Sequence, residues 1–261
     1  MKVARAIVDA RRESIATLVR RQGYLPVQDI SRRFRISPAT ARRDLEELAA
    51  QNRITRTHGG ALSDFNREFA SLDERRSTEA DAKRAIGRVG AELVKPGMTL
   101  YIDAGTTPLA VAEALASNPP RGLRVVTPSL SAAKALGRLP GVEVHLPGGL
   151  YLGRQEMLAG PEAAKALRGW RFDLAFVGAE GLDRDGLHNS QADIVAVTRE
   201  LTRLSERTVV CLTRSKVGVG GPVRVAPDLR GLTLLTDADA PDLARAGVRL
   251  AGATRLHAAS A

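Results

Sequence analysis

The sequence is poor in cysteine, in aromatic residues and in long apolar segments. A single cysteine, Cys211, excludes an internal disulfide and fits a reducing cytoplasm. Only 3% of the residues are aromatic, too few for a platform that stacks single-stranded nucleic acid. No apolar run approaches the ~20 residues that cross a bilayer, and the N-terminus lacks the pattern of an export signal. The four histidines and one cysteine show no ligand spacing, so we expect no metal site.

Positive charge is abundant and unevenly distributed. The formal net charge is +10, and residues 1–62 contain 13 Arg and Lys against 6 Asp and Glu, a net of +7. The rest of the chain carries only +3. Such asymmetry predicts that the N-terminal part meets a polyanion. Double-stranded DNA is favoured over a membrane surface because no basic helix with large apolar anchors occurs.

The basic N-terminal part has the pattern of a helix-turn-helix. Apolar residues recur at helical spacing from about residue 8 to 22 and again from 27 to 34. After a short turn, Ser37 is a good N-cap and Pro38 suits the first helical position, which predicts a third helix to Leu48. In a helix-turn-helix, the second helix of the closely joined pair reads the DNA.

The third helix would bury Ala41, Leu45 and Leu48 and expose a polar face with two adjacent arginines. An ordinary amphipathic helix with solvated charges has the same pattern, but a predicted β-wing follows, with a strand at 54–57 and a tip at 58–60. Arginine in a wing suits phosphate and minor-groove contacts. The residues expected to bind DNA are Ser37, Pro38, Ala39, Thr40, Arg42, Arg43, Arg53, Arg56 and His58.

A polar stretch at 63–71 is predicted to link this DNA-binding domain (1–62) to a second domain (72–261). The second domain should begin with a long helix from about Leu72 to Val94. Short apolar runs then alternate with helical segments, which predicts an α/β domain with a mainly parallel sheet covered on both faces. The expected strands are 99–102, 124–126, 142–146, 174–177, 208–212, 232–235 and 248–250.

Two sets of motifs occur in order between residue 11 and about residue 250. The first set is S-P-A-T-A-R-R-D-L and T-H-G-G-A, and the second is E-R-R, Y-I-D-A-G-T-T, T-P-S-L, P-G-G, F-V-G-A-E-G-L-D and S-K-V-G. With these motifs the chain resembles the DeoR family of bacterial transcriptional regulators. The resemblance implies a winged helix-turn-helix and a sugar-phosphate sensor domain similar in fold to ribose-phosphate isomerases and CoA transferases. It also implies a repressor of carbohydrate-metabolism genes that a phosphorylated sugar modulates.

The expected ligand site lies at the carboxyl ends of the parallel strands. Residues 103–107 lie between a predicted strand and a helix expected to begin at Pro108, whose N-terminal amides would attract an anion. A tight strand-to-helix turn would use the same residue types, but polar or glycine-rich loops also follow three further strands and should converge on one pocket. The expected effector-binding residues are Asp103, Gly105, Thr106, Thr107, Thr127, Ser129, Gly148, Gly149, Gly178, Glu180, Asp193 and Lys216.

Three positions depart from the family pattern. Asp193 replaces a common Glu, Thr213 replaces an Asp three residues before the motif lysine, and Pro26 stands where a Ser or Thr often caps the second helix. The first two changes touch the expected pocket and bear on which effector binds.

Two other functions remain open on the residues alone. A sugar-phosphate isomerase would need a carboxylate base, for which Asp103, Glu180, Asp183 and Asp193 are candidates. An architectural DNA-binding protein would bind without an effector. Because one winged domain covers only a half-site, a regulator should form a homo-oligomer, a dimer or a tetramer. No cofactor is expected beyond a phosphorylated sugar acting as effector.

Overall fold

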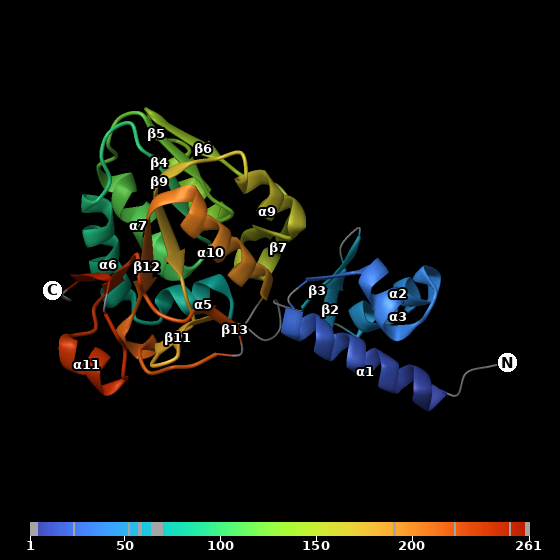
Figure 1. Cartoon of the computed structure of the whole chain (residues 1–261). Coiled ribbons are helices and arrows are strands. Elements are labelled where there is room, and N and C mark those ends of the chain that lie inside the picture. The colour runs from blue at the N-terminus through green and yellow to red at the C-terminus, as the bar shows by residue number, and fades with distance from the viewer. Residues whose placement is uncertain are drawn as a thin grey trace. The chain divides into compact units, whose positions relative to one another are not determined.

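The computed structural model describes residues 5–22, 24–51, 53–56, 59–63, 70–189, 192–221, 223–250 and 252–258. The chain folds into two compact units, and the main division falls between Ala70 and Ser71 (Figure 1). Among the described residues, no helix is long and apolar enough to cross a membrane.

The first unit is a three-helix fold with a small antiparallel sheet. Its apolar core joins side chains of the helices and the sheet, including the fully buried Ile15, Ile30 and Leu48. The strand order is β1-β3-β2. The elements are α1 (Arg5–Gln22), β1 (Tyr24–Pro26), α2 (Val27–Phe34), α3 (Pro38–Ala50), β2 (Ile54–Arg56) and β3 (Gly60–Ser63).

The segment after α1 differs from the expectation. Residues 24–26, which lie between the first two predicted helices and for which no strand was predicted, form β1 and pair with β3, with Leu25 opposite Ala61. The two backbones meet closely because Gly60 has no side chain: a Cβ there would lie 2.3 Å from the Leu25 carbonyl oxygen. Pro26 precedes α2 without a side-chain cap, as the sequence indicated.

The second unit is built on a seven-stranded sheet in which every neighbouring pair is parallel. The predicted α/β class with a mainly parallel sheet is therefore confirmed. From one edge to the other the strands are β15 (Thr254–His257), β14 (Leu232–Thr236), β12 (Ser205–Leu212), β9 (Phe172–Gly178), β4 (Thr99–Ile102), β5 (Leu123–Val126) and β6 (Val142–His145).

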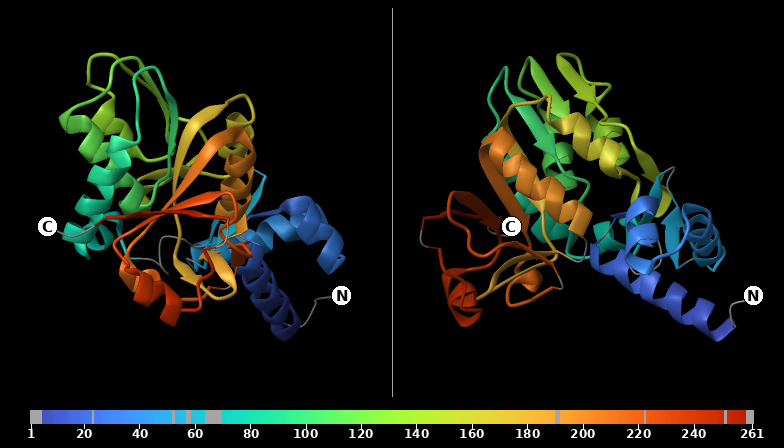
Figure 2. Two further views of the ribbon diagram at one scale, coloured as in Figure 1. Left: turned by 60° about the vertical axis from the view of Figure 1, so that its left-hand side comes forward. Right: turned by 45° about the vertical axis from the view of Figure 1, so that its right-hand side comes forward.

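Helices cover both faces of this sheet, as Figure 2 shows from two further sides. Successive residues of β4 point to opposite faces, so that Leu100 and Ile102 belong to one apolar core and Tyr101 to the other. The first core includes residues of α5 (Leu72–Ser77), α6 (Ala80–Glu92), α7 (Thr106–Ser117) and α8 (Leu130–Leu136). The second includes residues of α9 (Pro161–Leu167), α10 (Ala192–Leu204) and α11 (Ala240–Arg245).

Small elements decorate the sheet. They are the hairpin β7 (Leu150–Leu152) and β8 (Met157–Ala159), the antiparallel sheet β10 (Gly181–Asp183), β11 (Gly186–Asn189) and β13 (Val223–Ala226), and the 3-10 turns η1 (Gly153–Gln155) and η2 (Arg214–Lys216).

Three predicted boundaries are wrong. The long helix expected at 72–94 is divided into α5 and α6. Glu79 adopts a left-handed conformation with φ 52°, which interrupts the helix between them. The strand expected at 248–250 is absent, since Val248 and Leu250 make turn hydrogen bonds, and β15 forms at 254–257 instead. Helix α7 begins at Thr106, two residues before the expected Pro108.

Candidate functional site

Helix α3 of the first unit begins as the sequence predicted. Ser37 is its N-cap, and the Ser37 hydroxyl accepts a hydrogen bond from the Thr40 amide at 3.1 Å. Ser37, Pro38 and Ala39 are exposed and Thr40 is half-buried. The buried face packs Ala41, Leu45 and Leu48 into the core. Arg42 and Arg43 lie on the exposed face of the same helix.

A buried carboxylate anchors α3 to α1. Asp44 is only 2% exposed, and its two oxygens accept from Arg11 Nε at 2.7 Å and from Arg12 Nε at 3.0 Å. A carboxylate in this position is stable only when it is paired. Sequence reasoning missed this link, although Asp44 lies among the inward positions of α3 and two adjacent arginines lie on α1.

The wing arginines are paired with carboxylates of neighbouring helices. Arg53 Nη2 lies 2.6 Å from Glu13 Oε2, and Arg56 Nη1 lies 3.0 Å from Glu46 Oε1. Strands β2 and β3 form the wing as predicted, with Ile54 opposite Ser63. His58, the remaining expected contact, lies outside the described residues.

In the second unit, Asp103 joins the ends of two adjacent strands. It follows β4, and its carboxylate accepts from the Ala104 amide at 2.9 Å and from the Gly178 amide at the end of β9 at 3.0 Å. Burial raises the pKa of Asp103, while these two hydrogen bonds and the charge of Arg75 act in the opposite direction.

The start of α7 lies directly after Asp103. Gly105 is the N-cap and supplies no side-chain hydrogen bond to the first turn. Thr106 and Thr107 lie inside that turn, with buried side chains. The helix is twelve residues long, so its N-terminus adds the positive end of a helix dipole to this edge of the sheet.

The loops after β5 and β6 also lie at the carboxyl edge, but the hydroxyl groups there have other partners. Thr127 Oγ1 accepts from the Ser129 amide at 3.1 Å, and Ser129 Oγ accepts from the Ala132 amide at 3.2 Å and caps α8. Both side chains are buried. Gly148 and Gly149 follow β6, are exposed and have positive φ angles of 76° and 108°.

Two cations belong to the end of the sheet near Asp103. Lys216, at the end of η2, donates to the carbonyl of Ala179 at 2.9 Å. Burial lowers the pKa of Lys216, and the charge of Glu180 partly restores it. Arg75 of α5 donates through Nη2 to Gln155 Oε1 at 2.6 Å, and burial lowers its pKa against the influence of Glu180 and Asp103. The sequence prediction included Lys216 and Glu180 but missed Arg75.

Lys83 of α6 is a third buried cation beside this group. Its Nζ donates to the carbonyl oxygens of Arg75 and of Thr78, the latter at 2.6 Å. Burial, followed by the charge of Lys216, lowers the pKa of Lys83 to about 8. Nearby, Glu79 Oε2 accepts from Thr213 Oγ1 at 2.9 Å and from Ser215 Oγ at 2.7 Å.

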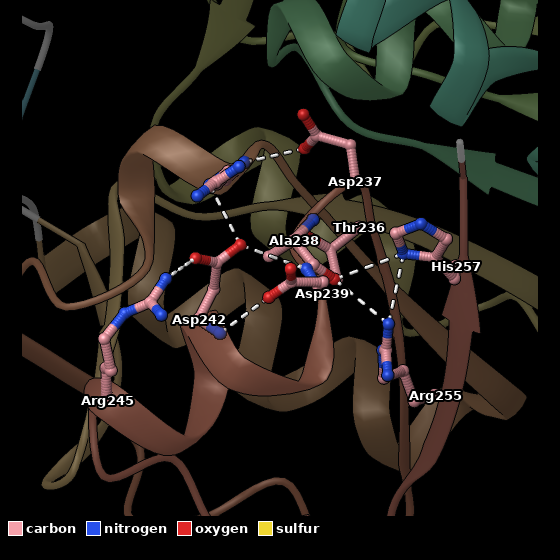
Figure 3. A network of polar contacts seen from close by, with 9 residues as sticks. Thr236, Asp237, Ala238, Asp239, Asp242, Arg245, Arg255 and His257 are labelled. Carbon is pink, nitrogen blue, oxygen red and sulfur yellow. Dashed lines mark hydrogen bonds and ion pairs between the residues drawn. The ribbon is translucent and has the colours of Figure 1, made fainter. Parts of the chain in front are cut away.

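The loop that carries Lys216 is anchored on its other side by Arg214. The Arg214 amide donates to Asp237 Oδ1 at 2.7 Å, and its guanidinium Nε lies 2.9 Å from Asp242 Oδ2. Figure 3 shows this network, in which Asp242 also contacts Arg245 and forms a capping box with Asp239. The polar contacts fix η2 against the loop after β14 and so position Lys216.

Asp193 lies in the first turn of α10, and its side chain is outside the described residues. Among the described residues, no group of three or more His, Cys, Asp or Glu side chains is arranged to hold a metal ion. The described site therefore consists of carboxylates, cations, hydroxyl groups and helix amides around the carboxyl ends of β4, β9 and β12.

A winged helix-turn-helix joined to an α/β unit with a polar site at its sheet edge defines a ligand-responsive transcriptional regulator. The chain belongs to the DeoR family. Residues 11–67 match the DeoR-like helix-turn-helix domain, and residues 78–238 match the DeoR C terminal sensor domain.

Curated relatives span most of the chain. The glycerol-3-phosphate regulon repressor of Escherichia coli K12 is 34% identical over 88% of this chain and 91% of the relative. The transcriptional repressor AccR of Agrobacterium fabrum is 34% identical over 79% of this chain and 80% of the relative. Among solved structures, ribose 5-phosphate isomerase A of Methanocaldococcus jannaschii covers 53% of this chain and 55% of its own, with 16% identity and a TM-score of 0.38.

Proposed function

We propose that this DeoR-family regulator represses carbohydrate-metabolism genes and that a phosphorylated sugar or polyol modulates its binding to operator DNA. The observation that carries the proposal is the grouping of Asp103, Lys216 and the N-terminus of α7 at one end of the sheet. These supply an acceptor for sugar hydroxyls together with a cation and helix amides for a phosphate. Two relatives that are named as repressors, one of them of a glycerol-3-phosphate regulon, support it.

In this proposal the three parts of the chain divide the work. Residues 1–62 bind DNA, 63–71 link the two domains, and 72–261 bind the effector and form a homo-oligomer. Two copies would place two α3 helices in successive major grooves of a two-fold operator. Because the proposed operator lies on chromosomal DNA, we expect the protein to be in the cytoplasm.

The DNA contacts come from α3 and the wing. The exposed guanidinium groups of Arg42 and Arg43 read bases or bind phosphates, and the cap of α3 meets the backbone. Arg53 and Arg56 would exchange their carboxylate partners for phosphates. The proposed set is Ser37, Pro38, Ala39, Thr40, Arg42, Arg43, Arg53, Arg56 and His58.

The effector contacts come from the strand ends. Asp103 would accept from sugar hydroxyls, while Lys216 and the amides around Gly105, Thr106 and Thr107 would hold the phosphate. Thr127 and Ser129 shape the neighbouring loop through their own hydrogen bonds. The remaining proposed contacts are Gly148, Gly149, Gly178, Glu180 and Asp193.

An isomerase would use the same carboxylates, but the matching family domains and the named relatives oppose it. Both family matches describe a regulator, one a DNA-binding domain and the other a sensor domain. The curated relatives given above match most of this chain's length, and they are named as repressors. We therefore assign no catalytic residue.

Two measurements test the proposal. Thermal unfolding of the full chain is followed with glycerol 3-phosphate, ribose 5-phosphate, galactosamine 6-phosphate and inorganic phosphate, since a ligand that binds the folded state raises the melting temperature. Binding to labelled DNA from upstream of its own gene and of adjacent genes is then measured with and without each compound. We expect at least one sugar or polyol phosphate to raise the melting temperature and change the DNA affinity. The absence of any response would overturn the effector assignment.

A further inference from the structure

A cavity of about 210 Å³ lies between α10 and the sheet, away from the carboxyl ends of the strands. Its floor is formed by side chains of three adjacent strands: Val177 of β9, Thr208 and Val210 of β12, and Leu232 of β14. Thr208 comes four residues before the end of β12, so about 13 Å of strand separates it from the loop that carries Lys216. None of the described residues that line the cavity belongs to the proposed effector-binding set.

Helix α10 covers this cavity, and one of its arginines holds a wall in place. Thr198 and Thr202 line the cavity from the helix. Arg199 donates through Nε to the carbonyl oxygen of Val225 at 3.0 Å and through Nη2 to that of Arg224 at 2.8 Å. These bonds tie α10 to β13, whose residues form another wall. The cavity is therefore bounded by a helix, a sheet and a strand that are fixed to one another.

A buried hydroxyl group lies on the otherwise apolar floor. Thr208 is only 3% exposed, and its hydroxyl forms no hydrogen bond with any residue that the structure describes. A buried hydroxyl without a partner costs free energy, whereas valine at this position would match the apolar floor at nearly the same size. A ligand in the cavity that carries a hydrogen-bonding group would give Thr208 the partner it lacks.

Positive charge gathers at the end of the cavity where Thr208 lies. Leu232 is opposite Thr208 in the sheet, and Arg230 comes two residues before Leu232. The exposed Arg199 provides a second guanidinium group to the lining. Asp228 is the acid at this end, and it lies 3.4 Å from Arg230. Since two cations outnumber one carboxylate, this end favours an anion.

The size and the deeper lining of the cavity define the rest of the ligand. Val177 and Val210 are neighbours in the sheet, and Leu187 lies with them in the lining, so this part takes an apolar group. A cavity of about 150 Å³ admits benzene, and the additional volume here leaves room for one small polar group. A phosphate without an apolar body would leave this part of the cavity unfilled.

We propose that this cavity is a second ligand site and that it binds a small monocarboxylate with an apolar body about the size of benzene. The carboxylate accepts hydrogen bonds from the Thr208 hydroxyl and from the guanidinium of Arg230, and the body packs on Val177 and Val210. The inference goes beyond the proposed function and does not depend on it, because the two sites use different residues.

The ligand class is tested by thermal unfolding of the full-length protein at constant ionic strength. We expect benzoate and hexanoate to raise the melting temperature in a saturable way, because both combine the charge with an apolar body. Acetate and inorganic phosphate, which lack the body, should raise it much less, and so should benzyl alcohol, which lacks the charge. The proposal is overturned if neither benzoate nor hexanoate raises it, or if acetate, phosphate or benzyl alcohol raises it equally.

The location is tested with Arg230→Gln and a matched control, Arg203→Gln. Both arginines are exposed and each lies 3.4 Å from one acid, but Arg203 is not among the described residues that line the cavity. We expect the dissociation constant for benzoate to rise roughly threefold in Arg230→Gln and to stay unchanged in Arg203→Gln. A rise of equal size in both variants would report net charge alone and would overturn the role of Arg230.

Thr208→Val tests the buried hydroxyl. It should weaken benzoate binding roughly fivefold without lowering the melting temperature of the free protein, since the hydroxyl loses no partner there. Wild-type affinity in both Thr208→Val and Arg230→Gln overturns the site. Both variants should keep the wild-type response to sugar and polyol phosphates. Loss of that response would mean that the two ligands share one site, which also overturns the inference, whereas a wild type that binds benzoate but no phosphorylated compound overturns the proposed function alone.

Discussion

Thr213 donates a hydrogen bond to Glu79 at 2.9 Å across 134 positions of sequence. Thr213 is fully buried, and Glu79 stands in a left-handed conformation between α5 and α6. In the family pattern that the sequence resembles, an aspartate is expected at the position of Thr213. A second carboxylate beside Glu79 would be repelled, so the hydroxyl at 213 and the carboxylate at 79 form a matched pair in this chain.

The first prediction concerns this pair. Thr213→Asp places two carboxylates together in a buried position, which raises the pKa of one of them and lowers stability. We expect a loss of about 2 kcal/mol in the free energy of unfolding near neutral pH, measured by denaturant titration. The double variant Thr213→Asp with Glu79→Gln should recover most of it, because the amide removes the repulsion. Additive losses in the double variant would contradict the pairing.

The second prediction concerns the pH dependence that Lys83 introduces. Burial and Lys216 lower the pKa of Lys83 from 10.5 to about 8, so between these values the unfolded chain binds more protons at this residue than the folded chain. Its contribution to stability therefore rises with pH from about 8 to 10.5. We expect the melting temperature of the wild type to rise across this window relative to that of Lys83→Met. A constant difference would show that Lys83 keeps an ordinary pKa, and a falling difference would show that its pKa is raised; either result contradicts the prediction.

The third prediction concerns the anchor of α3. Asp44→Ala leaves Arg11 and Arg12 without their buried carboxylate and should cost about 3 kcal/mol of unfolding free energy. DNA affinity should fall as well, since α3 loses its fixed orientation against α1. Asp9→Ala, which removes an exposed acid from α1, is the control and should change stability by less than about 0.5 kcal/mol. Equal stability of the two variants would exclude an anchoring role for Asp44.

Local patterns carried much of the fold prediction. The cap of Ser37, the proline at 38 and the apolar spacing of Ala41, Leu45 and Leu48 predicted α3, and the structure has all of these features. Apolar runs likewise predicted six of the seven strands in the parallel sheet. These signals are contained within about ten residues, so a single sequence is enough to read them.

Features that depend on distant partners were not predictable in this way. The break at Glu79 is stabilised by Thr213 and Ser215, more than 130 positions away, while the local pattern from 72 to 94 reads as one helix. The position of Arg75 beside Gln155 depends in turn on that break. The placement of Asp103 and Lys216 at one edge of the sheet was predictable because each lies in a loop that follows a strand, and a parallel sheet brings such loops together.

The fourth prediction concerns α3, the helix that we propose reads the DNA. Arg43→Ala should weaken binding to operator DNA, and if Arg43 binds a phosphate, the slope of log affinity against log salt should fall by about 1. An unchanged slope with loss of preference for the operator would instead indicate a base contact. Arg138→Ala removes an exposed arginine from the second unit and controls for net charge. Affinity equal to that of wild type would exclude a DNA contact by Arg43.

The fifth prediction concerns the wing. Arg56 is paired with Glu46 at 3.0 Å, and because both side chains are exposed the pair contributes at most about 1 kcal/mol to stability. Glu46→Gln should therefore leave the melting temperature nearly unchanged and release Arg56 for phosphate, which raises DNA affinity. Glu47→Gln removes the same charge from the same helix without touching Arg56, so it measures the general electrostatic gain. Equal gains in both variants, determined by anisotropy titration at one salt concentration, would mean that Arg56 binds no phosphate, whereas a larger gain for Glu46→Gln places Arg56 at the DNA.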